Sequence, residues 1–161
     1  MYSGFTADGI LKIMDFGLAS VIESTGPYSD DIYEMTGGTG SLRYMAPEVA
    51  DTRPYNHKCD VYSFSILLWE LLSCKKPYAG LSIDDYYDQV VYGGVRPNIE
   101  SKWNKELTEL MTKCWDAEHE NRPNSQEIVT TLESIGAAAA KVAPSRRKLS
   151  IANIKRRTIS S

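Results

Sequence analysis

The sequence has no pairing pattern among its cysteines, only two histidines and no long hydrophobic run. Cys59, Cys74 and Cys114 are far apart and never form a C-x-x-C pair, so neither a disulfide framework nor a zinc site is indicated. His57 and His119 have no cluster of further metal ligands around them in the sequence. The longest apolar stretch is far too short to cross a bilayer, so no transmembrane segment is expected.

Basic residues are scarce outside the end of the chain. The last 25 residues contain seven Lys or Arg and no acid, whereas the whole chain carries −3, so residues 1–136 carry −10. A body this acidic is a poor surface for nucleic acid, since neutralising phosphates requires clustered basic side chains. We expect no nucleic-acid partner. Unpaired cysteines fit the cytoplasm, or the nucleus, where thiols stay reduced.

The local patterns predict a short hairpin, a long loop and then helices. Residues 5–13 indicate two short strands around the turn Ala7-Asp8-Gly9. Residues 17–44 are rich in Gly, Ser, Thr and Asp without an apolar period, which indicates a functional or mobile loop. A helix over 61–72 is apolar on nearly every face and belongs in a core, with Asp60 as its N-cap.

Three more helices are predicted after this one, over 82–92, 105–115 and 126–135, the last ending at Gly136. The expected fold is therefore mainly α, with a short β-hairpin and about four to five helices in one domain over 1–136. Residues 137–161 form a low-complexity basic tail that we predict to be disordered.

Four motifs follow one another at characteristic spacings. Asp15-Phe16-Gly17 comes directly after a strand, where its carboxylate could serve a hard cation such as Mg²⁺; taken alone, the tripeptide also fits an ordinary turn. The segments 44–49, 60–64 and 121–123 read YMAPEV, DVYSF and NRP. In this order the motifs resemble the protein kinase family, specifically its tyrosine-kinase-like group, over roughly residues 4–136.

The resemblance implies the C-terminal lobe of a kinase domain, which in complete form uses ATP and Mg²⁺. Asp15 would hold the magnesium that bridges the ATP phosphates, and Phe16 would pack to set active or inactive geometry, with Gly17 completing the motif. Residues 15–48 would form the activation segment. Its phosphosite candidates are Thr36 and Thr39, with Ser24, Thr25, Tyr28, Ser29 and Tyr33 left open.

The same resemblance assigns structural and substrate-positioning roles downstream. Ser41 fills a position that is threonine in serine/threonine kinases and usually proline in tyrosine kinases, which favours Ser/Thr specificity. Glu48, which follows Ala46 and Pro47, would form a buried ion pair with Arg122. The carboxylate of Asp60, besides capping its helix, would accept N–H groups from the kinase catalytic loop.

Several kinase motifs do not occur in these 161 residues: the glycine-rich loop, the strand lysine with its helix glutamate, and the His-Arg-Asp catalytic loop. The chain alone is therefore expected to be inactive. Two interpretations stay open: a signalling Ser/Thr kinase represented by a fragment, or a catalytically inactive protein-binding module. The expected partners are protein substrates, and either the kinase N-lobe or another protein that covers an apolar face of the 61–72 helix.

The basic tail also carries two motifs of its own. Arg146-Arg147-Lys148-Leu149-Ser150 and Lys155-Arg156-Arg157-Thr158-Ile159-Ser160 place hydroxyl groups behind basic clusters, and both resemble sites for basophilic kinases. The alternative is a solvated tail without such a role.

Overall fold

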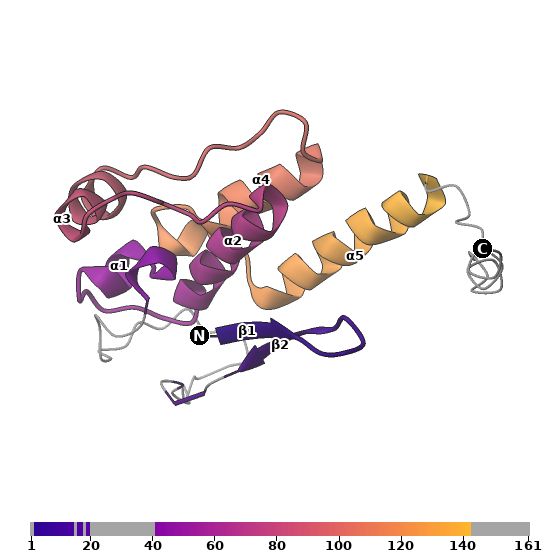
Figure 1. Cartoon of the computed structure of the whole chain (residues 1–161), viewed down its shortest axis with the longest axis horizontal. Coiled ribbons are helices and arrows are strands. Elements are labelled where there is room, and N and C mark those ends of the chain that lie inside the picture. The colour runs from indigo at the N-terminus through magenta and orange to yellow at the C-terminus, as the bar shows by residue number, and fades with distance from the viewer. Residues whose placement is uncertain (1, 15, 18, 20–40, 143–161) are drawn as a thin grey trace, which may run out of the picture.

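A helical body and a separate hairpin make up the computed structural model of the chain (Figure 1). The structure describes residues 2–14, 16, 17, 19 and 41–142. The candidate metal ligand Asp15, the candidate phosphosites Thr36 and Thr39 and the basic tail from residue 143 lie outside the described residues.

The hairpin predicted near the start is present. Strands β1 (Tyr2–Phe5) and β2 (Leu11–Met14) pair antiparallel, with Tyr2 opposite Met14 and Phe5 opposite Leu11. In the turn, Gly9 has a φ of 78°, a backbone conformation that residues with a Cβ atom rarely adopt. The hairpin brings the chain to residue 15 at the end of β2.

The rest of the described chain is helical, which confirms the mainly α prediction. The elements are η1 (Leu42–Tyr44), α1 (Pro47–Ala50), α2 (Lys58–Ser73), α3 (Ile83–Tyr86), the π-helical η2 (Tyr87–Tyr92), α4 (Lys105–Cys114), η3 (His119–Asn121) and α5 (Ser125–Val142). Within the described residues, no helix is long and apolar enough to span a membrane.

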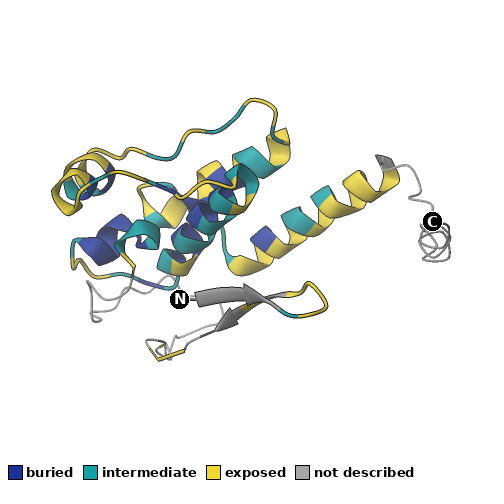
Figure 2. Ribbon diagram, viewed as in Figure 1, coloured by how far each residue is buried: buried dark blue, intermediate teal, exposed yellow. Residues whose placement is uncertain are grey.

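Helix α2 lies at the centre of the core, as its apolar sequence predicts (Figure 2). Tyr62 and Ile66 are completely buried, and they pack with Met111 of α4 and with the segment around α1. A second cluster joins Val61 and Cys114 to α5 through Ile128. The core therefore holds the chain from residue 45 to the start of α5 in one body.

The N-terminus of α2 differs from the prediction that Asp60 caps it. The helix begins at Lys58, so Asp60 lies inside the first turn. The side chain of Asn56 accepts the Lys58 N–H at 3.0 Å, which satisfies an early donor of the helix two residues upstream. The carboxylate of Asp60 is thereby left without a capping role.

The end of α5 also differs from the prediction. Asn124 and Glu127 exchange side chain to backbone hydrogen bonds of 2.8 and 2.9 Å, which starts the helix firmly. The helix then continues through Gly136 to Val142. A single glycine costs only about 1 kcal/mol in a helix, and the run 137–140 is alanine, the best helix former.

One face of α2 is incompletely covered. Asp60, Phe64, Leu67 and Leu71 recur at helical spacing on this face. Leu71 is 44% exposed, Asp60 is exposed, and Phe64 and Leu67 are only partly buried. The described chain covers the three apolar side chains of this face only in part, which leaves a surface for another segment or protein.

Candidate functional site

The segment that follows residue 40 is fixed to the core by three contacts. Arg43 donates from Nη1 to the carbonyl of Pro77, and the hydroxyl of Tyr44 donates to Glu70 Oε2 at 2.6 Å. Ser63 Oγ donates to the carbonyl of Tyr44 at 2.8 Å. Burial, followed by the contact with Glu70, raises the pKa of Tyr44 to about 12, so its phenol stays protonated as the donor.

Ser41 lies at the start of this segment, beside a cavity of about 190 Å³. Its own side chain is exposed, and the short helix η1 follows it directly. The cavity is formed by this segment together with the region that leads into α3. Its lining residues are Ser41, Leu42, Arg43, Tyr78, Leu81, Ser82, Ile83 and Tyr86.

Tyrosine side chains form the inner wall of the cavity. Tyr78 and Tyr86 meet edge to face, with ring centroids 5.3 Å apart. The Tyr78 hydroxyl lies 3.4 Å from that of Tyr62 in the core. The Tyr86 hydroxyl is buried and makes no hydrogen bond to any of the described residues, and burial raises its pKa. Almost none of this hydroxyl is exposed, so it is enclosed by protein and does not open onto the cavity.

Glu48 and Arg122 are brought together by the fold. Ala46 and Pro47 begin α1 as its N-cap and first residue, and all three residues from 46 to 48 are buried. Arg122 reaches the Glu48 carboxylate with both terminal nitrogens, Nη1 to Oε1 at 2.5 Å and Nη2 to Oε2 at 2.9 Å. This bidentate ion pair links the end of the segment to the loop before α5.

The remaining donors of Arg122 are also satisfied. Its Nε donates to the carbonyl of Asp116 at 2.9 Å, and Nη1 also donates to that of Lys58 at 3.2 Å. Lys58 Nζ in turn donates to the carbonyl of Arg122 at 2.7 Å. The fifth N–H, on Nη2, donates to the carbonyl of Ala117 at 3.4 Å, so every guanidinium donor of this residue, which is only 1% exposed, is hydrogen-bonded.

Sequence reasoning did not single out Tyr62 and Arg96. The Tyr62 ring has two guanidinium groups against it, with the carbon of Arg96 5.1 Å and that of Arg122 5.3 Å from its centroid. Arg96 also donates to the carbonyl of Trp115 at 3.0 Å. The sequence signal was weak, because Tyr62 looks like any apolar residue of α2 and Arg96 lies in a loop.

Asp60 and Phe16 are both exposed rather than packed. No hydrogen bond reaches the Asp60 carboxylate from the part of the chain that the structure describes, while surrounding protein displaces water and raises its pKa. The Phe16 side chain is 70% exposed in this chain, and the packing expected for it in a complete kinase domain stays a prediction. The described chain supplies no surface to cover this ring, and Gly17 beside it is also exposed.

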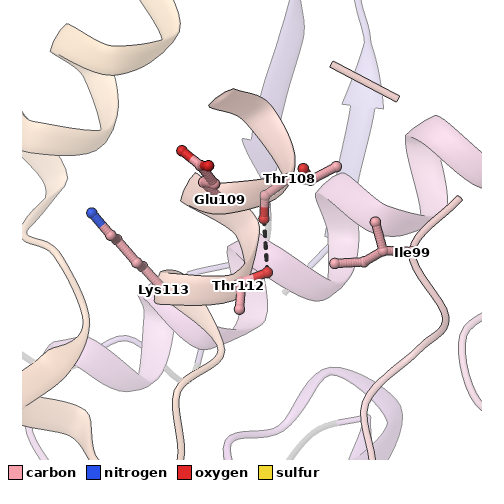
Figure 3. Close-up of a pocket in the computed structure, with 5 residues that line it drawn as sticks. All are labelled: Ile99, Thr108, Glu109, Thr112 and Lys113. Atoms are coloured by element: carbon pink, nitrogen blue, oxygen red, sulfur yellow. Dashed lines mark hydrogen bonds between the residues drawn. The ribbon is translucent and has the colours of Figure 1, made fainter. Parts of the chain in front are cut away.

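A second depression, of about 310 Å³, lies on the outer face of α4 (Figure 3). Its lining residues are Ile99, Thr108, Glu109, Thr112 and Lys113, of which Glu109 and Lys113 point away from Ile99. The Thr112 hydroxyl is used within the helix, donating to the Thr108 carbonyl at 2.8 Å. These residues bring together no group of catalytic side chains, so the cavity beside Ser41 is the stronger candidate site.

The helical body, the anchored segment and the Glu48–Arg122 pair together define part of a protein kinase domain. Residues 5–132 match the protein tyrosine and serine/threonine kinase family, and the chain belongs to it. The complete domain of this family uses ATP and Mg²⁺.

Relatives among characterised proteins agree with this assignment. The chain is 40% identical over 126 residues to serine/threonine-protein kinase STY17 of Arabidopsis thaliana, covering 78% of the chain and 21% of the relative. It is 44% identical over 128 residues to serine/threonine-protein kinase VIK of the same plant, covering 78% and 28%. Mitogen-activated protein kinase kinase kinase 7 of Drosophila melanogaster is 38% identical over 125 residues, covering 78% and 17%. The chain thus spans less than a third of each of these relatives.

Proposed function

We propose that this chain supplies the substrate-positioning part of a protein kinase domain, and that the complete domain transfers the γ-phosphate of ATP to Ser or Thr of protein substrates. The observation that carries the proposal is the position of Ser41. It stands with an exposed hydroxyl beside a cavity, on a segment held by the contacts of Arg43 and Tyr44. The serine/threonine kinase relatives support the same reaction.

The role proposed for Ser41 is to orient the substrate. A hydroxyl both donates and accepts a hydrogen bond, so Ser41 can contact the backbone or the hydroxyl of a bound Ser or Thr. Anchoring the neighbouring Arg43 and Tyr44 limits the movement of Ser41, which aligned phosphoryl transfer requires. The Glu48–Arg122 pair fixes the other end of the segment.

Asp15 is proposed to contribute one oxygen ligand to magnesium in the complete domain. Magnesium-bound ATP supplies the phosphoryl group, and the metal offsets charge that develops during transfer. Phe16 and Gly17, which follow Asp15 directly, are exposed, so this part of the chain is open to the kinase elements that these 161 residues do not contain. Phosphorylation at Thr36 or Thr39 is proposed to regulate the segment through new contacts with Arg or Lys.

A catalytically inactive binding module is the second candidate, favoured by the partly open face of α2. Phe64, Leu67 and Leu71 present apolar surface there, and Ile10 of the hairpin turn is 56% exposed. We propose that the N-lobe side of a complete kinase, or another protein, covers this face. The free state of all three cysteines supports a reducing compartment, the cytoplasm or the nucleus.

A chimera would test the proposed reaction. The preceding half of the kinase domain of Arabidopsis STY17 is joined to this chain, and transfer of labelled phosphate from ATP to myelin basic protein is measured with phosphoamino-acid analysis. We expect phosphoserine and phosphothreonine. Asp15→Asn should abolish transfer, whereas Asp8→Asn in the hairpin turn, a matched loss of charge, should leave it intact. Ser41→Ala should lower kcat/KM about tenfold, the equivalent of one hydrogen bond.

The two candidates predict different results with the chimera. An inactive chimera with a cooperative unfolding transition would overturn the kinase proposal and favour the binding module. Transfer that persists in Asp15→Asn would overturn the metal-ligand role of Asp15. Phosphotyrosine as the main product would overturn the substrate class inferred from Ser41.

A further inference from the structure

Two tyrosines of η2 reach the end of α1. The Tyr87 hydroxyl donates to the carbonyl of Ala50 at 3.1 Å, and the Tyr92 hydroxyl donates to Asp51 Oδ1 at 3.0 Å. The two acceptors are neighbours in the sequence, since Ala50 is the last residue of α1 and Asp51 is its C-cap. We call these four residues the tyrosine clamp.

The π-helical form of η2 lets both tyrosines face α1. In an α-helix successive residues turn by about 100°, so residues 87 and 92 would point about 140° apart. A π-helix bonds residues that are five positions apart, which brings such a pair to the same side. The rings of Tyr87 and Tyr92 accordingly have centroids only 6.2 Å apart. The rare π-helical turn is therefore matched to the tyrosine clamp.

The η2 segment is continuous with one wall of the cavity beside Ser41. It follows α3 directly, and Tyr86 is both the last residue of α3 and the N-cap of η2. Ile83 and Tyr86 of α3 line the cavity. Because α3 and η2 are joined without a loop, a shift of η2 relative to α1 would move this wall as well.

The opposite wall of the cavity is connected to the same short helix. The chain runs from Ser41 through η1 into α1, and only Met45 and Ala46 separate η1 from α1. The Glu48–Arg122 pair fixes α1 to the rest of the body. Figure 1 shows α1 and α3 at the same end of that body. Helix α1 therefore connects both walls, and the tyrosine clamp joins the α3 wall to it.

Of the two tyrosines, Tyr92 depends more on its hydrogen bond. The Tyr87 ring is half-buried and packs against the core, whereas Tyr92 is 66% exposed. An exposed ring gains little from burial, so the hydroxyl is what connects Tyr92 to α1. The acceptor is itself oriented, because Asp51 Oδ2 forms an ion pair with Arg53 Nε at 3.0 Å.

We propose that Tyr92 is a positioning residue for protein substrates, which acts by holding the α3 wall of the cavity beside Ser41 in place relative to α1. It contacts neither the substrate nor ATP. Its hydrogen bond to Asp51 keeps Ile83 and Tyr86 in their places in the lining. The inference rests on the proposed function in treating this cavity as the substrate-binding surface. The tyrosine clamp itself requires neither ATP nor catalysis.

The first test measures the tyrosine clamp in the full 161-residue chain, without catalysis. Tyr92→Phe removes the donor and keeps the ring, and the methyl signal of Ile83 is recorded by NMR. We expect this signal to shift, because loss of the hydrogen bond lets α3 move relative to α1. Thr130→Val is the control, since it removes an exposed hydroxyl whose hydrogen bond, 2.9 Å to the Gln126 carbonyl, lies within α5. That change should leave the Ile83 signal in place.

Variants of Asp51 show whether the effect passes through its carboxylate. Asp51→Ala removes the acceptor and should shift the Ile83 signal as Tyr92→Phe does. Asp51→Asn keeps an acceptor oxygen and should leave the signal near its original position. The double variant Tyr92→Phe/Asp51→Ala should shift the signal no further than either single variant, because both changes remove the same hydrogen bond.

The second test measures the kinetic effect in the chimera with the preceding half of the STY17 kinase domain. Tyr92→Phe should raise the KM for myelin basic protein about threefold and leave kcat unchanged, which is the lower range for loss of one hydrogen bond. The double variant Tyr87→Phe/Tyr92→Phe should raise this KM about tenfold. A merely structural defect would instead lower kcat with the amount of folded protein and leave KM unchanged.

Three results would overturn the inference. The first is an Ile83 signal that Tyr92→Phe leaves in place. The second is a double variant, Tyr92→Phe/Asp51→Ala, whose shift is the sum of the two single shifts. The third is an active chimera in which Tyr92→Phe leaves the KM for the protein substrate unchanged. An inactive chimera, together with an Ile83 signal that responds to Tyr92→Phe in the 161-residue chain, would contradict the proposed function alone.

Discussion

The carboxylate of Glu48 and the guanidinium of Arg122 form a bidentate ion pair inside the protein, although the two residues are 74 positions apart in the sequence. Their side chains are 7% and 0% exposed. The pair joins the end of the substrate-positioning segment to the loop before α5. Because each charge is removed from water, each depends on the other for compensation.

Breaking this pair should destabilise the chain strongly. Glu48→Gln leaves the Arg122 charge buried without its counter-ion, and we expect a loss of about 3–5 kcal/mol in the free energy of unfolding, measured with urea. Glu109→Gln is the control, since Glu109 is 59% exposed and its contact with Lys105 is 3.6 Å long. That change should cost less than about 0.5 kcal/mol. Equal effects of the two substitutions would show that burial does not govern the Glu48 interaction.

The incompletely covered face of α2 should cause the isolated chain to bind apolar molecules and to self-associate. We expect it to bind an apolar dye and to self-associate in ultracentrifugation, and we expect Leu71→Lys to reduce both. Val129→Lys is a matched control, because Val129 on α5 is 45% exposed and Leu71 is 44% exposed. A chain that is monomeric, does not bind the dye and melts cooperatively would contradict the expectation of an uncovered face.

The three thiols should differ sharply in reactivity. Cys74 is exposed, whereas burial raises the pKa of Cys59 and Cys114 to about 12, so the latter two form almost no thiolate at pH 8. We expect one thiol to react rapidly with Ellman's reagent in the folded chain. Urea should release the other two, and Cys74→Ser should remove the rapid phase. Three equally rapid thiols without urea would indicate that the core is open.

The local motifs of the chain were readable from its sequence, but the exact ends of its helices were not. The hairpin and the central helix follow from short-range patterns, and Ser82 caps α3 at the start of the predicted 82–92 helix, accepting the Asp85 N–H at 3.1 Å. The start of α2 differs from the prediction because Asn56, in the loop before the helix, provides the hydrogen bond expected from Asp60. Gly136 predicts the end of the last helix, but α5 continues to Val142 because the alanines after Gly136 outweigh its cost.

The candidate site was predictable only in part, since it depends on contacts between distant segments. The family resemblance pointed to Ser41, yet the cavity beside it requires Tyr78, Ile83 and Tyr86 from a region with no recognisable motif. The two guanidinium groups against Tyr62 also come from loops far away in the sequence. No local period encodes such long-range contacts.

The C-terminus of α2 should be improved by a glycine. Cys74 has a φ of 53°, in the left-handed region, where its N–H bonds to the Glu70 carbonyl. Cys74→Gly should raise the free energy of unfolding by about 0.5–1 kcal/mol, because glycine adopts this conformation without strain. Cys74→Ala removes the same thiol without relieving the backbone, so it should not stabilise the chain. If Cys74→Ala raised the free energy of unfolding by the same amount, the gain would come from removing the thiol and not from relieving the backbone conformation.

Asp60 and Glu100 should titrate in opposite directions from their ordinary values. Loss of surrounding water raises the pKa of Asp60, whereas the contact with Lys102 at 2.7 Å lowers the pKa of Glu100. NMR of the carboxyl carbons measures both values in one titration. The raised pKa of Asp60 also fixes how stability depends on pH. A carboxyl that binds its proton more tightly in the folded state stabilises the fold at acid pH. That contribution is lost as the pH rises through the pKa of the folded state.

The role proposed for Asp60 predicts that its pKa shift changes direction, from raised to lowered, in the chimera with the preceding half of a kinase domain. If backbone N–H groups of the catalytic loop bond to its carboxylate there, they stabilise the charged form and lower the pKa. Asp60→Asn should then destabilise the chimera, although it relieves an unpaired charge in the isolated chain. Because the described chain provides no hydrogen bond to this carboxylate, a pKa that stays raised in an active chimera would mean that Asp60 has no such partner and only occupies the first turn of α2.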